Sequence, residues 1–136
     1  MLVLDASVAV KWFVEEPGTA AAMALLAQDE SLIAPDLLVA EVANVAWKHL
    51  MRGDLELRQL AHVPEAVAKM FAELWPTVWL ASRAFEIAAE LRHPVYDCFY
   101  LALAEGEEAT LVTADRRLIG RLAGSRWEAL CRPLAA

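Results

Sequence analysis

The chain opens with Met1-Leu2-Val3-Leu4-Asp5-Ala6-Ser7, an apolar run that stops abruptly at a carboxylate. A short continuous apolar run bounded by polar residues is typical of a strand that is buried on both faces, as in a parallel sheet. Asp5 therefore belongs at the carboxyl end of a strand, where open α/β sheets bind their ligands. Ser7 stands at N-cap spacing before the next helix, and Asp5 alone is equally well explained as a turn or cap residue.

Strand and helix patterns alternate along the rest of the chain, with short connections between them. Strands are predicted over residues 31–34 and 110–113, edge elements over 74–79 and 127–130, and helices over 19–28, 37–50, 57–70, 82–91, 95–104 and from 116 onward. Asp36 and Asp54 are the expected caps of two of these helices, and Pro64 is expected to bend or split the helix that contains it. The alternation predicts a parallel α/β sheet with right-handed crossovers.

Length and composition describe one domain. The 136 residues are enough to bury a substantial core without disulfides, so a single domain is predicted over residues 1–136. Although 59% of the residues are hydrophobic, no uncharged apolar stretch reaches the roughly 18 residues that a membrane span needs. The N-terminus lacks the basic and small-residue features of a secretory signal, which predicts a cytoplasmic protein that does not enter the membrane.

The charge balance argues against one common class of function. With a formal net charge of −7, the chain is not expected to bind nucleic acid through bulk electrostatics, because neutralising phosphates requires a basic surface. A metal site that gathers the acidic residues would weaken this objection.

Neither the cysteines nor the histidines predict a metal site. Cys98 and Cys131 lack zinc or redox spacing and are expected to be packed thiols. His49, His62 and His93 share no metal-ligand spacing, and each is expected at the surface or at a helix end.

Two predicted helices carry acids in notable places. Glu41 lies inside the first of them, and Asn44 and Lys48 follow it at three and seven residues, so all three share one face. Asp97 is the sole charge in the first turn of a helix that is apolar almost all round and therefore buried. The alternatives are a solvated polar stripe for Glu41 and a dipole-favoured helix cap for Asp97. A carboxylate in apolar surroundings, however, needs a cation or strong hydrogen bonds, because burying an unpaired charge costs several kcal/mol.

The stretch Thr110-Leu111-Val112-Thr113-Ala114-Asp115 repeats the layout of the N-terminus, a brief apolar strand followed by a hydroxyl and a carboxylate. If the two strands are neighbours, Asp5 and Asp115 meet at one crevice, and Glu41 and Asp97 enter it from helices. Carboxylates about 4 Å apart repel by roughly 4 kcal/mol, so such a cluster persists only with protons or divalent cations. Oxygen ligands alone select Mg²⁺ or Mn²⁺ over zinc.

Four motifs together resemble one family, the PIN-domain nucleases, and within it the compact VapC-type toxins of toxin–antitoxin pairs. The motifs are Leu4-Asp5-Ala6-Ser7, Glu41-Val42-Ala43-Asn44, the helix Tyr96-Asp97-x-x-Tyr100-Leu101-Ala102-Leu103-Ala104, and Thr113-Ala114-Asp115-Arg116-Arg117-Leu118. The resemblance covers essentially the whole chain and depends on the order and spacing of the motifs. It implies a PIN-like three-layer α/β/α fold with a short, mostly parallel central sheet.

The resemblance also implies a site and a reaction. The residues implied as catalytic, metal-binding acids are Asp5, Glu41, Asp97 and Asp115. Those implied in supporting positions are Ser7, Asn44 and Thr113. Mg²⁺ or Mn²⁺ held by the acids would activate a water for attack on a phosphodiester of RNA, leaving a 5′-phosphate and a 3′-hydroxyl. Arg117 stands where some relatives have a further acid, which bears on how firmly a second metal is held.

Partners are expected from the resemblance and from the surplus of apolar residues. Large exposed apolar patches mark interaction sites, so a homodimer is expected. The family implies a VapB-type antitoxin whose amphipathic segment lies in an apolar groove and whose basic side chain reaches the acids. Core packing is expected for at least half of the tryptophans that could line these surfaces, which are Trp12, Trp47, Trp75 and Trp79. Candidates for phosphate contacts are Lys11, Lys48, Arg52, Arg83, Arg116, Arg117 and Arg121.

Three other classes of protein compete with the nuclease. A receiver-type phosphoacceptor domain has an adjacent acidic pair in its first acid motif and a lysine after a late strand, and neither stands at the matching place. A haloacid-dehalogenase-like phosphatase needs a second Asp where this chain has Ser7. The stronger alternative is a non-catalytic acidic α/β module whose apolar surface binds protein partners. Manganese-dependent cleavage of RNA separates that module from the nuclease.

Overall fold

A five-stranded sheet, parallel at every pairing, forms the centre of the computed structural model, which describes residues 1–135. The strands are β1 (Leu2–Leu4), β2 (Leu32–Pro35), β3 (Glu73–Trp75), β4 (Thr110–Thr113) and β5 (Cys131–Pro133). Their order is β3-β2-β1-β4-β5, so β1 is central and all of its residues are buried. The chain winds outward from β1 to β3 and then crosses to the other side of β1. The strand order therefore reverses between β1 and β4, the kind of switch point where such sheets bind ligands.

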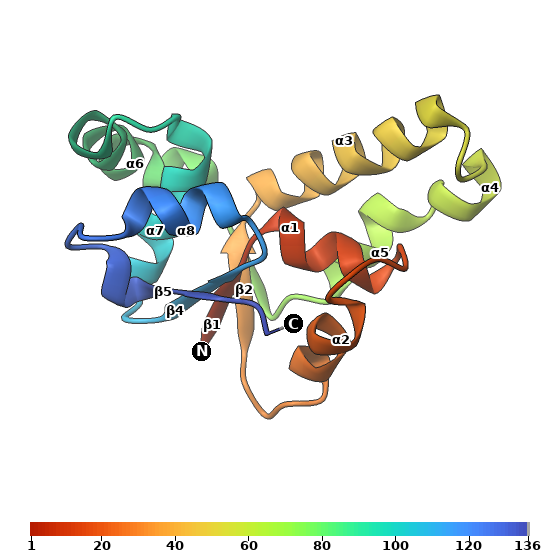
Figure 1. Ribbon diagram of the computed structural model, residues 1–136, viewed down its shortest axis with the longest axis horizontal. Coiled ribbons are helices and arrows are strands. Elements are labelled where there is room, and N and C mark those ends of the chain that lie inside the picture. The colour runs from red at the N-terminus through yellow and green to blue at the C-terminus, as the bar shows by residue number, and fades with distance from the viewer. Residues whose placement is uncertain (136) are drawn as a thin grey trace.

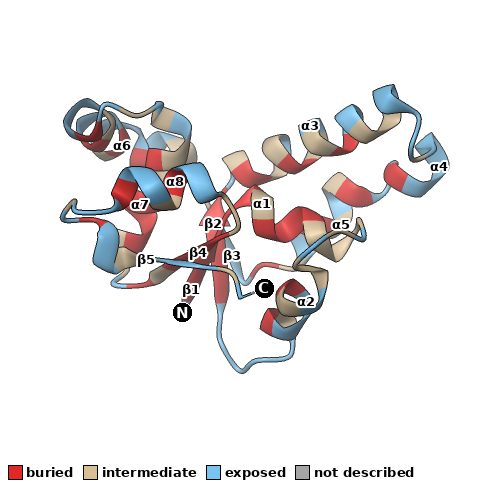
Figure 2. Cartoon of the chain, viewed as in Figure 1, coloured by how far each residue is buried: buried red, intermediate tan, exposed pale blue. Residues whose placement is uncertain are grey.

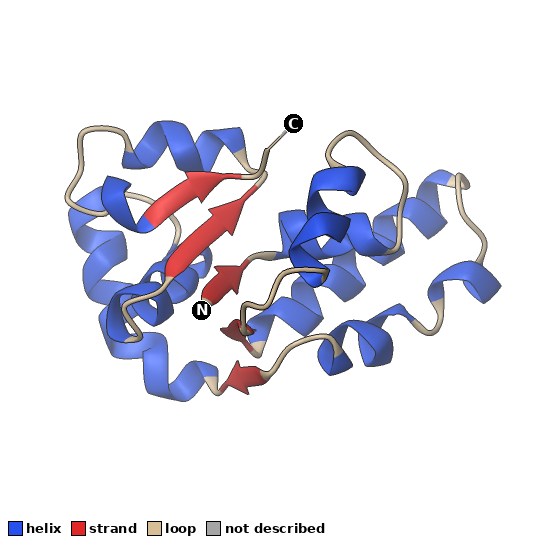
Figure 3. Cartoon of the chain, turned by 90° about the horizontal axis from the view of Figure 1, so that it is seen from below, coloured by secondary structure: helices blue, strands red, loops and turns tan. Residues whose placement is uncertain are grey.

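Helices cover both faces of the sheet, as Figures 1 and 3 show. On one side lie α1 (Ala6–Ala9), the 3-10 turn η1 (Val10–Trp12), α2 (Thr19–Leu26), α3 (Leu37–Arg52), α4 (Leu57–Leu60) and α5 (Val63–Lys69). On the other lie α6 (Thr77–Leu91), α7 (Val95–Gly106), α8 (Arg116–Leu122) and the 3-10 turn η2 (Glu128–Leu130). The predicted three-layer α/β/α fold is confirmed. Within residues 1–135, no helix is long and apolar enough to cross a membrane.

The apolar runs of the sequence form the core between these layers. Figure 2 shows buried residues along the strands and on the inward sides of the helices. Helix α7 contacts β1, β2 and β4, and six of its twelve residues are buried, which explains why its sequence is apolar almost all round. This central position brings the start of α7, with Asp97, toward the middle of the sheet.

Helices α3, α4 and α5 form an arm that extends beyond the sheet (Figure 1). The inward side of α3 is lined by Leu38, Val42 and Ala46, and the helix ends at Gly53, whose φ of 78° suits a residue without a side chain. Outward-facing apolar residues on the arm are Trp47, Met51 and Leu57, which are 54%, 60% and 62% exposed. The arm therefore has one side that packs on the domain and one apolar side that faces solvent.

Two of the predicted helix caps have other roles. Asp5, and not Ser7, caps α1, because its carboxylate accepts a hydrogen bond from the Val8 amide. Asp36 stands at the start of α3, yet its Oδ1 accepts from the Thr77 amide at 3.1 Å, which belongs to α6. Asp36 therefore joins the starts of two helices that follow neighbouring strands.

Helix boundaries differ from the prediction in the middle of the chain. The helix expected over residues 57–70 is split, as Pro64 suggested, and Pro64 lies in the first turn of α5, where its missing N–H costs no hydrogen bond. Glu56, and not Asp54, caps α4 through a capping box with Gln59. Helix α6 begins at Thr77, earlier than the predicted residue 82.

The strand predicted over residues 127–130 is wrong. These residues contain η2, and the edge strand β5 follows at Cys131–Pro133, beside β4. Trp127 is only 2% exposed, and its Nε1 donates to Glu105 at 3.2 Å. The large buried side chain holds the backbone in a tight turn, so the apolar pattern here reflects one anchored tryptophan instead of an alternating strand.

The expectation of packed thiols is confirmed. Cys98 is buried and Cys131 is half-buried, and both are free. Burial raises the pKa of Cys98 to about 11 and that of Cys131 to about 12. Both thiols therefore stay protonated and unreactive at neutral pH.

Candidate metal centre and active site

The four acids predicted from sequence belong to elements grouped around the carboxyl end of β1. Asp5 follows β1 directly, and Asp115 lies two residues beyond β4, the parallel neighbour of β1. Glu41 lies in the second turn of α3, and Asp97 in the first turn of α7. The predicted neighbour relation of the strands that lead to Asp5 and Asp115 is confirmed.

Asp5 is a buried carboxylate held by two hydroxyls and a backbone amide. It is 6% exposed. The Ser7 hydroxyl donates to Oδ1 at 2.5 Å, and the Val8 amide approaches the same oxygen at 3.3 Å. The Thr113 hydroxyl donates to Oδ2 from the neighbouring strand. Because these donors surround both oxygens, the orientation of the carboxylate is fixed.

The same two hydroxyls connect the ends of β1 and β4. The Ala114 amide donates to the Ser7 hydroxyl at 2.9 Å, and the Asp115 amide donates to the Thr113 hydroxyl at 3.0 Å. The hydroxyl oxygens of Ser7 and Thr113 lie 3.3 Å apart. Ser7 and Thr113 therefore both bind Asp5 and join the ends of the two strands.

The environment of Asp5 disfavours its charge. Burial raises the pKa of Asp5 from 3.8 to about 6, although the hydrogen bonds from Ser7, Thr113 and Val8 act in the opposite direction. The negative charge of Asp97 adds to the rise. Asp5 is therefore a carboxylate that would gain from a nearby cation.

Glu41 is fixed by a tyrosine that the sequence analysis did not assign to the site. The hydroxyl of Tyr100, a residue 1% exposed on α7, donates to Glu41 Oε1 at 2.5 Å. Burial, and then the charge of Asp97, raise the pKa of Glu41, whereas the bond from Tyr100 lowers it. Burial and the charge of Glu41 raise the pKa of Tyr100 well above its usual value, so the phenol stays a donor.

Asp97 is held by a histidine that was expected only at the surface or at a helix end. His93 Nε2 lies 2.6 Å from Asp97 Oδ2, and both side chains are partly buried. His93 precedes Asp97 by four residues across the start of α7, a spacing that could have indicated the contact. His49, in contrast, lies at the end of α3 beside Asp54, as expected for a helix-end histidine.

Asp115 and Asn44 are placed differently from the other predicted site residues. The Asp115 carboxylate caps α8, accepting from the Arg117 amide at 2.9 Å and the Leu118 amide at 3.4 Å. Asn44 lies on α3 one turn beyond Glu41 and is exposed. Asp115 thus lies just beyond the end of β4, with its carboxylate bound to its own helix.

Electrostatics tie three of the acids together. The charge of Asp97 raises the pKa of both Asp5 and Glu41, and the charges of all three raise the pKa of Tyr100. Such mutual effects require short separations, because screening by water removes the influence of distant charges. Asp97 therefore lies close enough to act on both Asp5 and Glu41, and Tyr100 contacts Glu41 directly.

The donor set of this site fits a hard divalent cation in its chemistry. Carboxylate and hydroxyl oxygens are the ligands that Mg²⁺ and Mn²⁺ prefer, and a cation would offset the charges that raise the pKa values of Asp5 and Glu41. In residues 1–135 every buried side-chain oxygen and nitrogen already has a hydrogen-bond partner. Across the same residues, no three Asp, Glu, His or Cys side chains are grouped as a ready-made metal site. The acids would therefore hold a cation together only if their side chains moved closer to one another than they lie here.

The fold and the site together define a class, a doubly wound parallel α/β domain with acids at its switch point. Comparison with known proteins identifies the family within this class. The family model described as the PIN domain matches residues 2–124. The chain belongs to the PIN-domain family.

Relatives that share about a third of their residues with this chain carry the name VapC. Ribonuclease VapC3 of Pyrobaculum aerophilum is 34% identical over 119 residues, which cover 86% of this chain and 91% of the relative. Ribonuclease VapC9 of Mycobacterium tuberculosis is 33% identical over 118 residues, which cover 87% of this chain and 88% of the relative. The chain therefore matches such proteins over most of their length.

Solved structures support the fold. A crystal structure of a protein from Pyrobaculum aerophilum aligns with a TM-score of 0.70 at 23% identity, covering 88% of this chain and 78% of that one. A toxin–antitoxin complex from Klebsiella pneumoniae contains a chain that aligns with a TM-score of 0.68 at 18% identity, covering 93% and 94%. At these identities the likeness concerns the architecture alone.

Proposed function

We propose that this chain is an endoribonuclease that uses Mg²⁺ or Mn²⁺, and that it is the toxin of a toxin–antitoxin pair in the cytoplasm. The observation that carries the proposal is the placement of Asp5, Glu41 and Asp97 around the switch point of the sheet, where Asp5 and Glu41 are each held by hydroxyl donors and feel the charge of Asp97. The name ribonuclease VapC borne by the relatives supports RNA as the substrate.

The side chains of this site would prepare it for hydrolysis of a phosphodiester. A divalent cation held by these carboxylates would supply a water of lowered pKa and would offset charge on the phosphate oxygens. Ser7 and Thr113 keep Asp5 in one orientation, Tyr100 does the same for Glu41, and His93 does so for Asp97. Such supporting hydrogen bonds orient ligands and limit the rearrangement that cation binding requires.

The test is cleavage of a single-stranded RNA by the purified chain with Mn²⁺ or Mg²⁺, against a control in EDTA. Cleavage is expected only with the cation, and the new ends should be a 5′-phosphate and a 3′-hydroxyl. Asp5→Asn is the matched control for contaminating nucleases, because it removes one charge and keeps the shape. An RNA left intact by the wild-type chain with both cations would favour the non-catalytic interaction module.

The arm offers a surface for an antitoxin. Trp47, Met51 and Leu57 are exposed and apolar on α3 and α4, and α3 also carries Glu41. An amphipathic helix covers such a strip with residues spaced three and four apart. Its basic side chain would be attracted by the acids and by the net charge of −7. Toxicity that co-expression of the neighbouring open reading frame does not relieve would remove the toxin–antitoxin assignment.

The opposite side of the domain offers a surface for a second copy. Val78, Trp79 and Phe85 on α6 and Tyr96 on α7 are between 60% and 77% exposed. A hollow of about 590 Å³ beside them is lined by Ala81, Ser82, Phe85, Glu86, Val95 and Phe99. A two-fold axis would bury this patch against itself, which suits an apolar face with little charge. Light scattering that reports a monomer at micromolar concentration would contradict the dimer.

Tryptophan positions agree with these two surfaces. Trp12 and Trp75 are partly buried and pack against the core, and the ring of Trp12 lies tilted against that of Phe71 with centroids 5.6 Å apart. Trp47 and Trp79 are exposed on the arm and on α6, respectively. The expectation that at least half of the four would pack in the core is confirmed, and the other two lie on the surfaces proposed for partners.

A further inference from the structure

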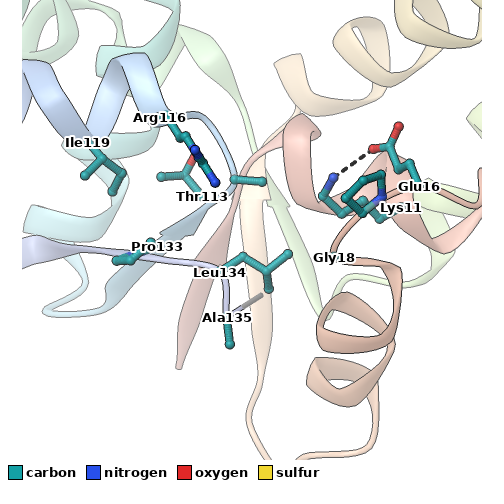
Figure 4. A pocket seen from close by; sticks show the side chains of 11 residues that line it. Lys11, Glu16, Gly18, Thr113, Arg116, Ile119, Pro133, Leu134 and Ala135 are labelled. Carbon is teal, nitrogen blue, oxygen red and sulfur yellow. Dashed lines mark hydrogen bonds and ion pairs between the residues drawn. The ribbon is translucent and has the colours of Figure 1, made fainter.

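A pocket lies at the ends of β4 and β5, and Figure 4 shows the side chains that line it. Its volume is about 570 Å³, within the range of roughly 300–1,000 Å³ that is usual for small-molecule sites. Its walls come from the loop after η1, the ends of β4 and β5, and α8. The pocket is therefore built from segments that are far apart in the sequence.

Thr113 belongs both to this pocket and to the acidic site. Its side chain lines the pocket, and its hydroxyl donates to Asp5 Oδ2. Since β1 is central, the pocket lies on the β4 side of Asp5, whereas Glu41 follows β2 on the other side. A linear polymer that passes over the acids along this edge of the sheet would continue into the pocket.

Arg116 gives the pocket a positive charge that the protein does not neutralise. Four of the seven cations predicted for phosphate contacts already have partners. Lys11 binds Glu16, and Arg52 binds Asp54. Arg83 binds Glu105, and Arg121 donates to the Arg92 carbonyl. Among residues 1–135, Lys48, Arg116 and Arg117 form no ion pair. Of these three, only Arg116 lines the pocket.

The rest of the wall is suited to a flat, partly apolar group. Pro17, Ile119, Pro133 and Leu134 surround the space, and Lys11 and Glu16 form an ion pair of 2.9 Å at one side of it. A site for a bare inorganic anion would need several polar donors around the anion. Here one guanidinium stands beside apolar side chains, which matches a phosphate joined to a nucleoside.

We propose that this pocket binds a nucleotide next to the scissile phosphate of single-stranded RNA, with Arg116 contacting its phosphate and the apolar wall contacting its base or ribose. This inference rests on the proposed nuclease function and names the path of the substrate. Single strands suit it, because their unstacked bases are free to enter pockets. Arg116 is a binding residue, and its charge holds the strand while the acids act on the neighbouring phosphate.

The test measures binding of a fluorescein-labelled single-stranded oligoribonucleotide by fluorescence anisotropy, in EDTA so that no cleavage occurs. Arg116→Ala is compared with Arg117→Ala, which removes the same charge from the same turn of α8 outside the pocket. Arg116→Ala should raise Kd about tenfold, as expected for a lost hydrogen bond to a charged group. It should also reduce the slope of log Kd against log salt by about 0.7, and Arg117→Ala should change Kd by less than about twofold.

Two controls sharpen the experiment. Arg116→Lys should recover part of the affinity, because the charge remains while the two-pronged contact is lost. Adenosine 5′-monophosphate should displace the RNA at lower concentration than inorganic phosphate does. Equal effects of Arg116→Ala and Arg117→Ala, equal displacement by the two competitors, or no measurable binding by the wild-type chain would overturn the pocket proposal. The proposed function is decided separately, by whether the wild-type chain cleaves RNA with Mn²⁺.

Discussion

Asp5 and Asp115 follow adjacent parallel strands, and both cap the helix that comes next, yet their surroundings differ. Asp5 comes directly after the central strand, is 6% exposed and receives two hydroxyl hydrogen bonds. Asp115 comes two residues after β4, is half-buried and receives backbone amides of α8. Similar stretches of sequence thus produce one carboxylate with a pKa raised to about 6 and one that serves mainly its helix in this structure.

The position of an acid relative to the end of its strand therefore decides how much free energy its charge costs. Directly after a central strand, the carboxylate is covered by neighbours on both sides, and burial dominates its pKa. Two residues later the chain has left the sheet, and the first turn of a helix offers free amides.

Removal of a charge from the acidic site should have the largest effect. Asp5→Asn and Asp97→Asn keep the shape of the side chains, and each should lower kcat for RNA cleavage by about 10³-fold, the size seen when one charge-stabilising group is lost. Circular dichroism should show that both variants fold. Full activity of Asp97→Asn would remove Asp97 from the site.

The stability of the metal-free protein should depend on pH mainly through Asp5. Folded Asp5 keeps its proton up to about pH 6, whereas the unfolded chain releases it near 3.8. Between these values the folded state binds more protons, so the free energy of unfolding falls as pH rises, by about 3 kcal/mol from this group. The raised pKa of Glu41 acts in the same direction. Urea unfolding in EDTA from pH 4 to 7 measures the fall, and Mg²⁺ should reverse it at pH 7.

The matched variants for that experiment are Asp5→Asn and Asp115→Asn. The first should remove most of the pH dependence, and the second should leave it almost unchanged. Unfolding curves that respond neither to pH nor to Mg²⁺ would count against an acidic site that gains from a cation.

Loss of the hydroxyl shared by the two strand ends should have an intermediate effect. Thr113→Val has nearly the same shape but leaves Asp5 Oδ2 and the Asp115 amide without a partner. The free energy of unfolding at pH 7 should fall by about 1–3 kcal/mol, and kcat should fall roughly tenfold. Thr110→Val, at the start of the same strand, is the control. If both variants lost the same stability, the effect would belong to the strand and not to the hydroxyl.

The cap of α8 should have the smallest effect on stability. Asp115→Ala removes the acceptor for two amides and should cost about 1 kcal/mol, whereas Asp115→Asn keeps an N-cap acceptor and should cost less. Thermal melts give the comparison. If Asp115 also binds the cation, both variants lose cleavage, and a fully active Asp115→Asn would leave Asp115 as a cap alone.

The sequence predicted the strands β1, β2 and β4, and the acids that follow β1 and β4, because these features depend on local patterns. Uninterrupted apolar runs marked β1 and β4, and a polar residue after each run marked the strand end. The family and the three-layer fold are confirmed as well. The metal-binding roles of the four acids stay predictions.

Other features could not be predicted because they depend on tertiary contacts. Tyr100 in an apolar helix looked like a core residue, and only the packing of α7 beside α3 brings its hydroxyl to Glu41. Trp127 looked like part of a strand until its burial against Glu105 fixed a tight turn. The length of α6 was underestimated, because Pro76 and Thr77 give no clear sign of how far the helix extends beyond the apolar face.

The hydroxyls of Ser7 and Thr113 have one proton each, and this count has a consequence for how the site responds to acid. While Asp5 is ionised, both protons point to it, and the 3.3 Å contact between the two hydroxyl oxygens carries no hydrogen bond. When Asp5 takes up a proton, one carboxyl oxygen becomes a donor, and one hydroxyl can rotate to use that contact instead. Protonation of Asp5 therefore reverses the direction of hydrogen bonds among the oxygens of Asp5, Ser7 and Thr113, while the ends of β1 and β4 stay in place.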